Sequence, residues 1–418
     1  MRVFEHPRGR LALGVVAVTA AFAAAGCGGS SSTSSSSSST GSSPSTSSTA
    51  SASGAGGSYL GPGTTGLGIR QSTGERKEKA EAAGTEAGKQ AGAPAKAPSA
   101  TVGIINFLNG IESSDRLADS TKYAASQMGW KSVVCDGKGE PTQFVACGNS
   151  LIAQGVNAIV VIAIEPSQIQ AVLAKTTAAH IPVVQVGGGA VPTGALSGNY
   201  GPNEAEAGEL LSSALLKKLD ALPGTPEIAI HNFPALWGSE RTKQLTKAVS
   251  AQSKVKIGAN VVTDAANLVP FTRTTVTNQI TQNPNLKAYW FTFDTTGQVG
   301  GGVLAAKYAG KEFPNRPLVL TFHGDHATLA LMRKGEIDMV SEVNFDAAVW
   351  EGIDGIAQEL ARKQPMKKEN QPTYPVIGDP FTYSIVTKAG LPPEGEYVAP
   401  KWDVPSYFIA KWKAEYGV

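Results

Sequence analysis

Apolar residues between positions 101 and 186 follow two alternating patterns. Short apolar runs predict strands at Val102–Asn106, Ser132–Cys135, Ala158–Ala163 and Pro182–Val186. The continuous apolar character of Ala158–Ala163 predicts that this strand is buried on both faces. The stretches between them have the spacing of helices that pack on one side, at Arg116–Met128, Phe144–Ala153 and Ser167–Ala179. Strands that alternate with helices of this length predict βαβ units and a parallel sheet.

The same rhythm returns in the second half of the chain. The expected strands are Glu227–His231, Lys256–Val262, Ala288–Phe293, Leu318–Phe322 and Met339–Val343. The expected helices are Ser239–Ala251, Thr274–Gln282, Gln298–Ala309, Ala327–Lys334 and Ala347–Lys363, and a proline-rich tail expected to be mostly coil follows them. The pattern therefore predicts an α/β fold with two doubly wound parallel-sheet lobes, whose ligand cleft lies at the carboxyl ends of the strands.

The N-terminus has the pattern of a secretory signal. Arg2, Arg8 and Arg10 precede an apolar run at Leu11–Ala25 that is short for a transmembrane helix, and small residues lead to Cys27. A cysteine in this place resembles the lipobox of bacterial lipoproteins, and an ordinary signal peptide with a chance cysteine is the alternative. The resemblance implies a signal peptide at 1–26, diacylglycerol on the sulfur of Cys27, and an extracytoplasmic, membrane-anchored location.

Residues 27–100 are expected to form a disordered tether. They are rich in Ser, Thr, Gly and Ala, with a charged patch at Glu75–Glu81, and such a composition buries too little apolar surface to offset chain entropy. A coil of about 70 such residues has a root-mean-square reach of roughly 45 Å. The tether therefore serves as a spacer between a lipid anchor and the folded part.

Charge and cysteine content further reduce the set of possible functions. The formal net charge of +2, with scattered basic residues, gives no sign of a nucleic-acid partner, and no cofactor is expected. With Cys27 assigned to lipid, Cys135 and Cys147 remain as an even pair in an oxidising compartment. We expect them to form a disulfide, because neither has the nearby histidine that metal binding or catalysis would need.

Four segments in order carry a family resemblance. They are Gln154-Gly-Val-Asn-Ala-Ile-Val-Val, Ile181-Pro-Val-Val, Gly238-Ser-Glu-Arg-Thr and Asn283-Pro-Asn-Leu-Lys-Ala. Together they resemble type I periplasmic binding proteins of the ribose-binding kind, the solute receptors of ABC importers. The resemblance spans Thr101–Val418. It implies a monomer that closes on a small molecule and delivers it to a permease.

The resemblance also implies three crossovers between the lobes. We expect them near Tyr200–Asn203, Asn344–Ala347 and Phe381–Ile385. Lobe one then comprises residues 101–201 and 347–382, and lobe two comprises 202–346 and 383–418.

The sugar-binding pattern of the resembled family is largely absent. Its polar cleft positions fall on Phe107, Glu165, Gly187, Gly188, Phe293, His323 and Ala347, and its pair of phenylalanines falls on Ser113 and Ser114. An acidic residue and an arginine are kept as Asp294 and Arg241. The expected ligand-binding set is Phe107, Glu165, Gly187, Gly188, Trp237, Arg241, Phe293, Asp294, His323 and Asn344. Aromatic walls and a free arginine favour a small, partly apolar ligand, with an aromatic or apolar carboxylate as a candidate, over a plain pentose.

Each assignment has a structural alternative. Phe293 can belong to the core, Arg241 can be an exposed helix charge, His323 can be a hydrogen-bonded structural histidine, and Glu165 can cap a helix.

The sequence leaves other functions to be considered. A sugar receptor with a remodelled pocket is the nearest alternative. A secreted hydrolase is disfavoured because the chain has no Gly-x-Ser-x-Gly or His-Glu-x-x-His motif, and His323-Gly-Asp-His is a weak metal pattern, so no metal site is expected. A transcriptional regulator of the same fold is disfavoured because the signal and tether occupy the place of its DNA-binding helices.

Overall fold

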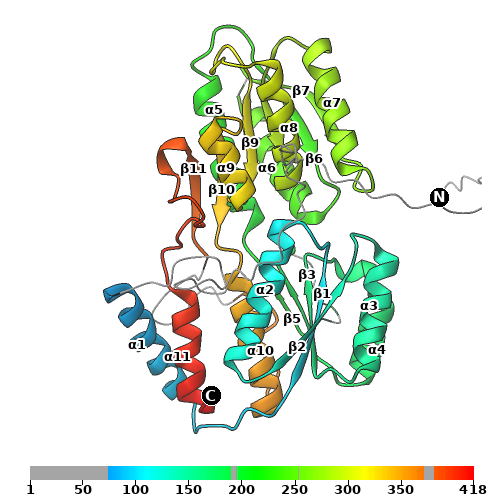
Figure 1. Cartoon of the computed structure of the whole chain (residues 1–418), viewed down its shortest axis with the longest axis vertical. Helices are drawn as coiled ribbons and strands as arrows, with labels where there is room; N and C mark the ends of the chain where they lie inside the picture. Colours follow the sequence, from blue (N-terminus) through cyan, green and yellow to red (C-terminus); the bar gives the residue numbers. More distant parts are fainter. Residues whose placement is uncertain (1–73, 190–193, 195, 253, 371–380) are drawn as a thin grey trace, which may run out of the picture. The chain divides into compact units, whose positions relative to one another are not determined.

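The structure is a computed structural model that describes residues 74–189, 194, 196–252, 254–370 and 381–418. Two β-sheets organise these residues, and helices lie on both faces of each sheet (Figure 1). The expected α/β fold of two parallel-sheet lobes is therefore confirmed. The signal peptide, Cys27 and most of the expected tether lie outside the described residues.

The first sheet has the strand order β2-β1-β3-β4-β5 and is parallel throughout. Its strands are β1 (Thr101–Asn106), β2 (Lys131–Asp136), β3 (Ala158–Ile162), β4 (Val183–Val186) and β5 (Gly198–Tyr200). The helices that belong to this lobe are α2 (Glu112–Gln127), α3 (Pro141–Ala153), the 3-10 turn η1 (Pro166–Gln168), α4 (Gln170–Ala178) and α10 (Ala347–Arg362). Every residue of β3 is buried, as its continuous apolar run predicts.

The second sheet has the order β11-β10-β9-β8-β6-β7, and β11 alone runs antiparallel among these strands. The strands are β6 (Glu227–Asn232), β7 (Lys256–Val262), β8 (Leu286–Phe291), β9 (Leu318–Phe322), β10 (Met339–Val343) and β11 (Tyr383–Thr387), and the 3-10 turn η2 (Lys388–Gly390) follows them. The helices are α5 (Glu204–Leu219), α6 (Leu236–Ser250), α7 (Leu268–Gln282), α8 (Asp294–Lys307) and α9 (His326–Lys334). Across the two sheets and their helices, the sequence pattern located most elements but did not identify β5 of the first sheet, or α5 and β11 of the second.

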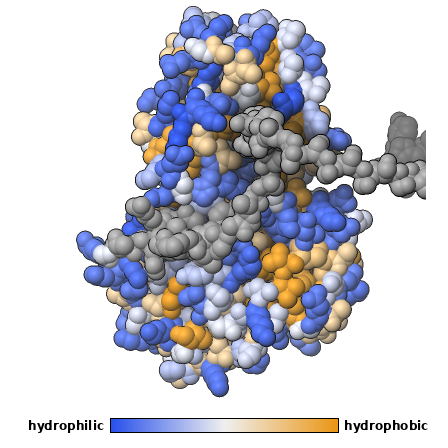
Figure 2. Space-filling view, in the orientation of Figure 1, coloured by the Kyte–Doolittle hydropathy of each residue, from blue (hydrophilic) through white to orange (hydrophobic). Residues whose placement is uncertain are grey.

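Apolar clusters on both faces of each sheet form the core. Figure 2 shows a visible face that is mostly hydrophilic, with apolar residues in separate patches. The chain passes from β5 to α5 at residues 201–203 and from β10 to α10 at residues 344–346, which are the places expected for two of the crossovers.

The C-terminal segment departs from the expected division. β11 does join the second sheet, but the chain then returns to lobe one, where it forms α11 (Val404–Tyr416). Tyr407, Phe408 and Trp412 of α11 are buried in the same cluster as Trp350 of α10. Residues 383–418 were expected in lobe two as a coil-rich tail, and this expectation is wrong for α11 because its aromatic face completes the core of lobe one.

The expected tether is also too long. Residues 75–90 form a helix, α1 (Glu75–Gln90), which packs along α11 on lobe one (Figure 1). Gly84 and Gly88 let the two helices approach closely: a Cβ on Gly84 would lie 2.0 Å from the backbone oxygen of Tyr407. The composition concealed this helix because its buried side consists of Ala and Gly rather than large apolar residues.

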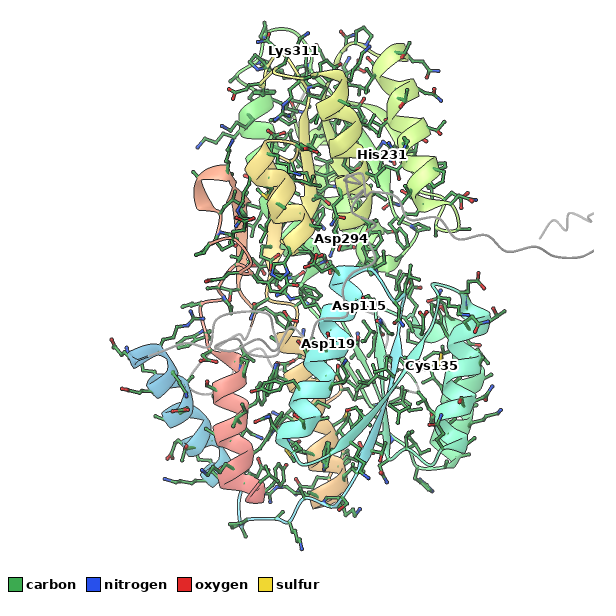
Figure 3. The ribbon with its side chains drawn as sticks, in the orientation of Figure 1. Asp115, Asp119, Cys135, His231, Asp294 and Lys311 are labelled. Carbon is green, nitrogen blue, oxygen red and sulfur yellow. A yellow bond between two sulfur atoms is a disulfide. The ribbon has the colours of Figure 1, made fainter. Side chains whose placement is uncertain are left out.

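The disulfide is confirmed. Cys135 at the end of β2 is bonded to Cys147 in α3, with their Cα atoms 5.6 Å apart (Figure 3). It joins an exposed edge strand of the first sheet to the helix that covers it.

Candidate ligand-binding site

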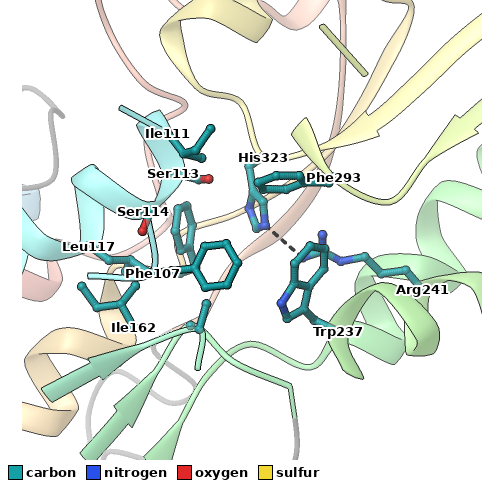
Figure 4. Close-up of a pocket in the computed structure, with 13 residues that line it drawn as sticks. Phe107, Ile111, Ser113, Ser114, Leu117, Ile162, Trp237, Arg241, Phe293 and His323 are labelled. Carbon is teal, nitrogen blue, oxygen red and sulfur yellow. Dashed lines mark hydrogen bonds between the residues drawn. The ribbon is translucent and has the colours of Figure 1, made fainter. Parts of the chain in front are cut away.

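A cavity lies where strand ends of the first sheet face α6 and the strand ends of the second sheet (Figure 4). Its lining residues come from both lobes and are Phe107, Ile111, Ser113, Ser114, Leu117, Ile162, Ala163, Gly187, Trp237, Arg241, Phe293, His323 and Phe345. The cavity has a volume of about 50 Å³. This is small for a ligand pocket, since such pockets commonly measure roughly 300–1,000 Å³. A solute larger than a few water molecules therefore requires the walls to move apart.

Three lining residues that follow strand ends have left-handed backbones. They are Ala163 after β3 (φ 53°), Gly187 after β4 (φ 65°) and His323 after β9 (φ 65°). Such conformations are uncommon for residues other than glycine, and they gather at functional sites. At Gly187 the cost is small, and a Cβ there would lie 2.5 Å from Leu117 Cδ1. Glycine at this position therefore keeps the cavity floor open beside Leu117.

One wall of the cavity is an aromatic cluster. Trp237, at the start of α6, stacks on Phe233 with ring centroids 5.0 Å apart, and Phe293 lies 5.5 Å from Trp237. Phe107 reaches this cluster from lobe one, with its ring centroid 6.4 Å from that of Phe233. The aromatic wall can accept the flat or apolar face of a solute.

Arg241 in α6 lines the cavity but its charge is already balanced. Its Nε donates to Glu204 Oε2 at 2.6 Å, its Nη1 donates to the backbone oxygen of Thr292 at 2.7 Å, and its Nη2 lies 2.9 Å from His323 Nε2. Arg241 and Glu204 are both buried. The guanidinium therefore acts as a structural cation, and the prediction that it pairs a ligand carboxylate is not supported.

His323 lies beside Arg241, with its ring 4.5 Å from that of Phe345. Burial, together with the charges of Arg241 and Arg116, lowers the pKa of the imidazole well below its ordinary value. The ring is therefore neutral at physiological pH.

The sequence matches the model of the periplasmic binding protein domain over residues 102–364. The chain belongs to this family. Its members are binding receptors, so the chain is a solute-binding protein and not an enzyme. No curated protein matches the sequence.

Solved structures of low sequence identity share the fold. One, from Mycobacterium smegmatis in complex with β-D-fucofuranose, is 18% identical with a TM-score of 0.58 and covers 70% of this chain and 92% of that one. An ABC transporter solute-binding protein from Burkholderia graminis with D-arabinose is 21% identical (TM-score 0.60; 71% and 98% covered). Another from M. smegmatis, with glycerol, is 20% identical (TM-score 0.61; 72% and 100% covered).

The structure divides the residues predicted for the cleft of this binding protein into two groups. Six of them line the cavity: Phe107, Gly187, Trp237, Arg241, Phe293 and His323. The other four are outside its lining. Glu165 accepts a hydrogen bond at 2.8 Å from the backbone nitrogen of Leu236 at the start of α6, and Gly188 lies against the side chain of Gln185.

Asp294 and Asn344 have structural partners instead. Asp294 is buried at the start of α8, at the end of lobe two that faces α2, and it accepts from Thr295 Oγ1 at 2.9 Å (Figure 3). Asn344 lies in a crossover and accepts from the backbone nitrogen of Thr382 at 2.6 Å. It thereby joins two of the segments that connect the lobes.

Sequence reasoning missed the aliphatic part of the cavity wall. Ile111, Leu117 and Ile162 line it from lobe one, and Phe345 lines it from a crossover. Leu117 and Ile162 occupy core-type positions of a helix and a strand, so their pattern gives no sign of a binding role. Phe345 directly follows Asn344 in a crossover between the lobes, and this position could have indicated that Phe345 lines the cavity.

A buried ion cluster connects the two lobes beside the cavity. Arg116 of α2 lies 2.5 Å from Asp346 in the second crossover, 3.7 Å from Glu342 of β10 and 3.8 Å from Asp325, which precedes α9. Its guanidinium carbon lies 4.0 Å from the ring centroid of Tyr397. Burial raises the pKa of Glu342 to about 7, against the opposing effect of Arg116.

A second carboxylate spans the lobes at the start of α9. Glu112 of α2 accepts from the backbone nitrogens of His326 and Ala327 at 2.8 and 3.2 Å, and from the hydroxyl of Tyr397 at 2.7 Å. A carboxylate at a helix N-terminus is favoured by the helix dipole and the free backbone N–H groups. Glu112 therefore acts as a contact between lobe one and lobe two.

Among the residues that the structure describes, no group of His, Cys, Asp and Glu side chains is arranged to hold a metal ion. Within the same residues, no helix is both long and apolar enough to span a bilayer.

Proposed function

We propose that this chain is the extracytoplasmic substrate-binding lipoprotein of an ABC importer, and that it captures a small solute between its lobes for delivery to a permease. Membership of the periplasmic binding protein family supports the receptor role. The N-terminal sequence supports secretion and a lipid on Cys27, although that segment lies outside the described residues. Solved structures of similar fold include ABC transporter proteins, and this supports the importer.

We further propose that the solute is neutral and has an apolar face. The observation that carries this proposal is the cavity wall, in which aromatic and aliphatic side chains from both lobes predominate and the one arginine is already paired with Glu204. A free carboxylate on the solute would lack a cation at this wall. The carboxylate anticipated from the sequence is therefore replaced by an uncharged molecule.

A sugar or polyol with an apolar face is the second candidate. It is favoured by the three similar structures, which contain β-D-fucofuranose, D-arabinose and glycerol. Sugars stack an apolar face on aromatic rings, and Trp237 and Phe293 supply such rings here.

A thermal-shift screen of the full-length protein tests the class of solute. The panel contains D-arabinose, D-fucose, glycerol, neutral alicyclic and aromatic alcohols and ketones, and the matching carboxylates. Neutral molecules with an apolar face should raise the free energy of unfolding by about 2.7 kcal/mol at a hundredfold excess over Kd. Stabilisation by the carboxylates alone would contradict the proposed class.

Tryptophan fluorescence locates the binding event. A hit from the screen should change the emission of Trp237, so Trp237→Phe should remove most of the change. Trp402, outside the cavity lining, provides the matched control, and Trp402→Phe should keep the change. Loss of the signal in Trp402→Phe but not in Trp237→Phe would place the site elsewhere.

Cys27→Ser tests the anchor. Without the sulfur, lipid cannot be attached, so the variant should be released to the medium or retained with its signal uncut. Cell fractionation with mass determination measures both, and Cys147→Ser, which leaves Cys27 intact, serves as the control. A Cys27→Ser chain that stays in the membrane fraction at its processed mass would rule out this anchor.

A further inference from the structure

The ring of His323 contains a buried polar atom with no hydrogen-bond partner among the described residues. His323 lines the cavity and is only 9% exposed, and its Nδ1 is completely buried and unpaired. Leaving a buried donor or acceptor unsatisfied costs about 1–3 kcal/mol. An unpaired atom of this kind, in a residue that lines a cavity, indicates that a molecule which moves the cavity walls apart can complete its hydrogen bonding.

The partner of the other ring nitrogen determines which role Nδ1 has. Arg241 Nη2 lies 2.9 Å from His323 Nε2, and a guanidinium can only donate. Nε2 must therefore accept, and a neutral imidazole then carries its single proton on Nδ1. Glu204 and the backbone oxygen of Thr292 hold the guanidinium in place, so the tautomer of His323 is fixed by a chain of buried contacts.

The position of the ring is fixed as well. The backbone nitrogen of His323 donates to the backbone oxygen of Ser341 at 3.0 Å, and its φ of 65° places the residue in the left-handed region. Phe345 packs against the ring. Strain of this kind at a cavity is typical of a pre-organised side chain.

The other polar groups of the cavity are few. Ser114 Oγ donates to Asn106 Oδ1, and Arg241 has its three partners. Ser113 adds a hydroxyl at the start of α2. A histidine N–H with a fixed direction therefore stands out in a wall that is otherwise largely apolar.

We propose that the Nδ1–H of His323 is the hydrogen-bond donor by which the cavity selects solutes that carry an acceptor oxygen, such as a carbonyl, ether or hydroxyl group, on a mainly apolar frame. The inference rests on the proposed function, because it takes the cavity to be the site of solute capture. It excludes solutes whose only polar group is an ammonium ion, since two donors would face each other.

The tautomer is tested without any solute. Nitrogen-15 NMR of the histidine-labelled full-length protein at neutral pH, assigned with His323→Asn, should show a neutral ring protonated on Nδ1. Replacing the donor with Arg241→Met should let the tautomers mix. A wild-type ring that is protonated on Nε2, or on both nitrogens, overturns the proposal.

Selection is tested with two probes of similar shape, cyclohexanone and cyclohexylammonium, followed by calorimetry. The wild type should bind cyclohexanone and not cyclohexylammonium. His323→Asn keeps an N–H donor near the place of Nδ1 and tolerates the left-handed backbone, so it should bind cyclohexanone within about threefold of wild type. His323→Asp replaces the donor with acceptors, so it should lose roughly tenfold or more for cyclohexanone and gain affinity for cyclohexylammonium.

D-Arabinose, measured alongside, distinguishes failure of the proposed selection by His323 from failure of the proposed receptor function. If the wild type binds D-arabinose with a Trp237 fluorescence change but does not bind cyclohexanone, the receptor function stands and the proposed selection is overturned. If His323→Asp keeps the wild-type preference between the two probes, the selection is likewise overturned. If the wild type binds none of the three, the proposed function falls together with this inference.

Discussion

At the scale of single residues, Arg241 shows how burial changes a role that the sequence suggests. The family resemblance predicted a cleft position for it, and Arg241 does line the cavity. The sequence could not show that Glu204, on another helix, lies 2.6 Å from its Nε, because that contact depends on how α5 packs against α6. Phe107, Trp237 and Phe293 were predictable as lining residues because aromatic side chains that follow strands face the cleft of this fold.

Arg241→Ala should therefore destabilise the protein without any ligand. Removing one partner leaves Glu204 as a buried, unpaired charge, at a cost of roughly 3–5 kcal/mol. Urea unfolding measures the loss.

The double variant Arg241→Met with Glu204→Gln should recover much of that loss, because it removes both charges. Lys243→Ala, an exposed position on the same helix, provides the control and should change stability by less than about 0.5 kcal/mol. A wild-type unfolding curve for Arg241→Ala would show that the ion pair contributes nothing.

At the scale of elements, the regular βαβ strands and helices were predictable and the two terminal helices were not. Strands β7, β9 and β10 begin and end where the sequence predicts. Helices α1 and α11 lie outside the matched family region of residues 102–364. Each of these helices is stabilised by packing on the other, so neither has a spacing of apolar residues that by itself indicates a buried helix.

The close approach of α1 and α11 gives a sharp test. Gly to Ala in a helix normally stabilises a protein by about 0.5–1 kcal/mol. Gly84→Ala should do the opposite, because its Cβ would lie 2.0 Å from the backbone oxygen of Tyr407. Urea unfolding and limited proteolysis within residues 75–90 should detect a loosened α1.

Gly302→Ala in α8 is the matched control. The nearest atom to its Cβ would be Glu336 Oε2 at 3.9 Å, so this change should give the ordinary stabilisation. Equal stabilisation by Gly84→Ala and Gly302→Ala would mean that α1 does not pack on α11 in solution.

At the scale of the whole folded part, the buried ion cluster makes the free energy of unfolding depend on pH. Arg116 comes from lobe one, Glu342 and Asp325 from lobe two, and Asp346 from a crossover. Long-range clusters of this kind are invisible in the sequence, since their members are scattered over four separate elements. Three acids share one arginine here. Burial raises the pKa values of Glu342, Asp325 and Asp346.

The sign of the pH dependence follows from Glu342. Its pKa is about 7 in the folded protein, against 4.5 as the reference value, so the folded state holds a proton that the unfolded state releases between these values. Its stabilising contribution is complete below pH 4.5 and is lost as the pH rises through 7. Each pKa unit corresponds to about 1.4 kcal/mol, so the loss is of the order of 3–4 kcal/mol.

The free energy of unfolding should therefore fall between pH 5.5 and pH 8. Glu342→Gln should flatten this slope, because Gln stays neutral and keeps an acceptor for the backbone nitrogen of Gly324. Glu394→Gln, at an exposed position, should leave the slope unchanged.

Solute affinity should depend on pH in the same direction. The cluster joins the lobes, so opening the lobes would hydrate Glu342 and release its proton. Solute should therefore bind more weakly at pH 8 than at pH 6. If Glu342→Gln and the wild type gave parallel pH profiles in both unfolding and solute affinity, the Glu342 carboxyl would not be the group that couples pH to stability.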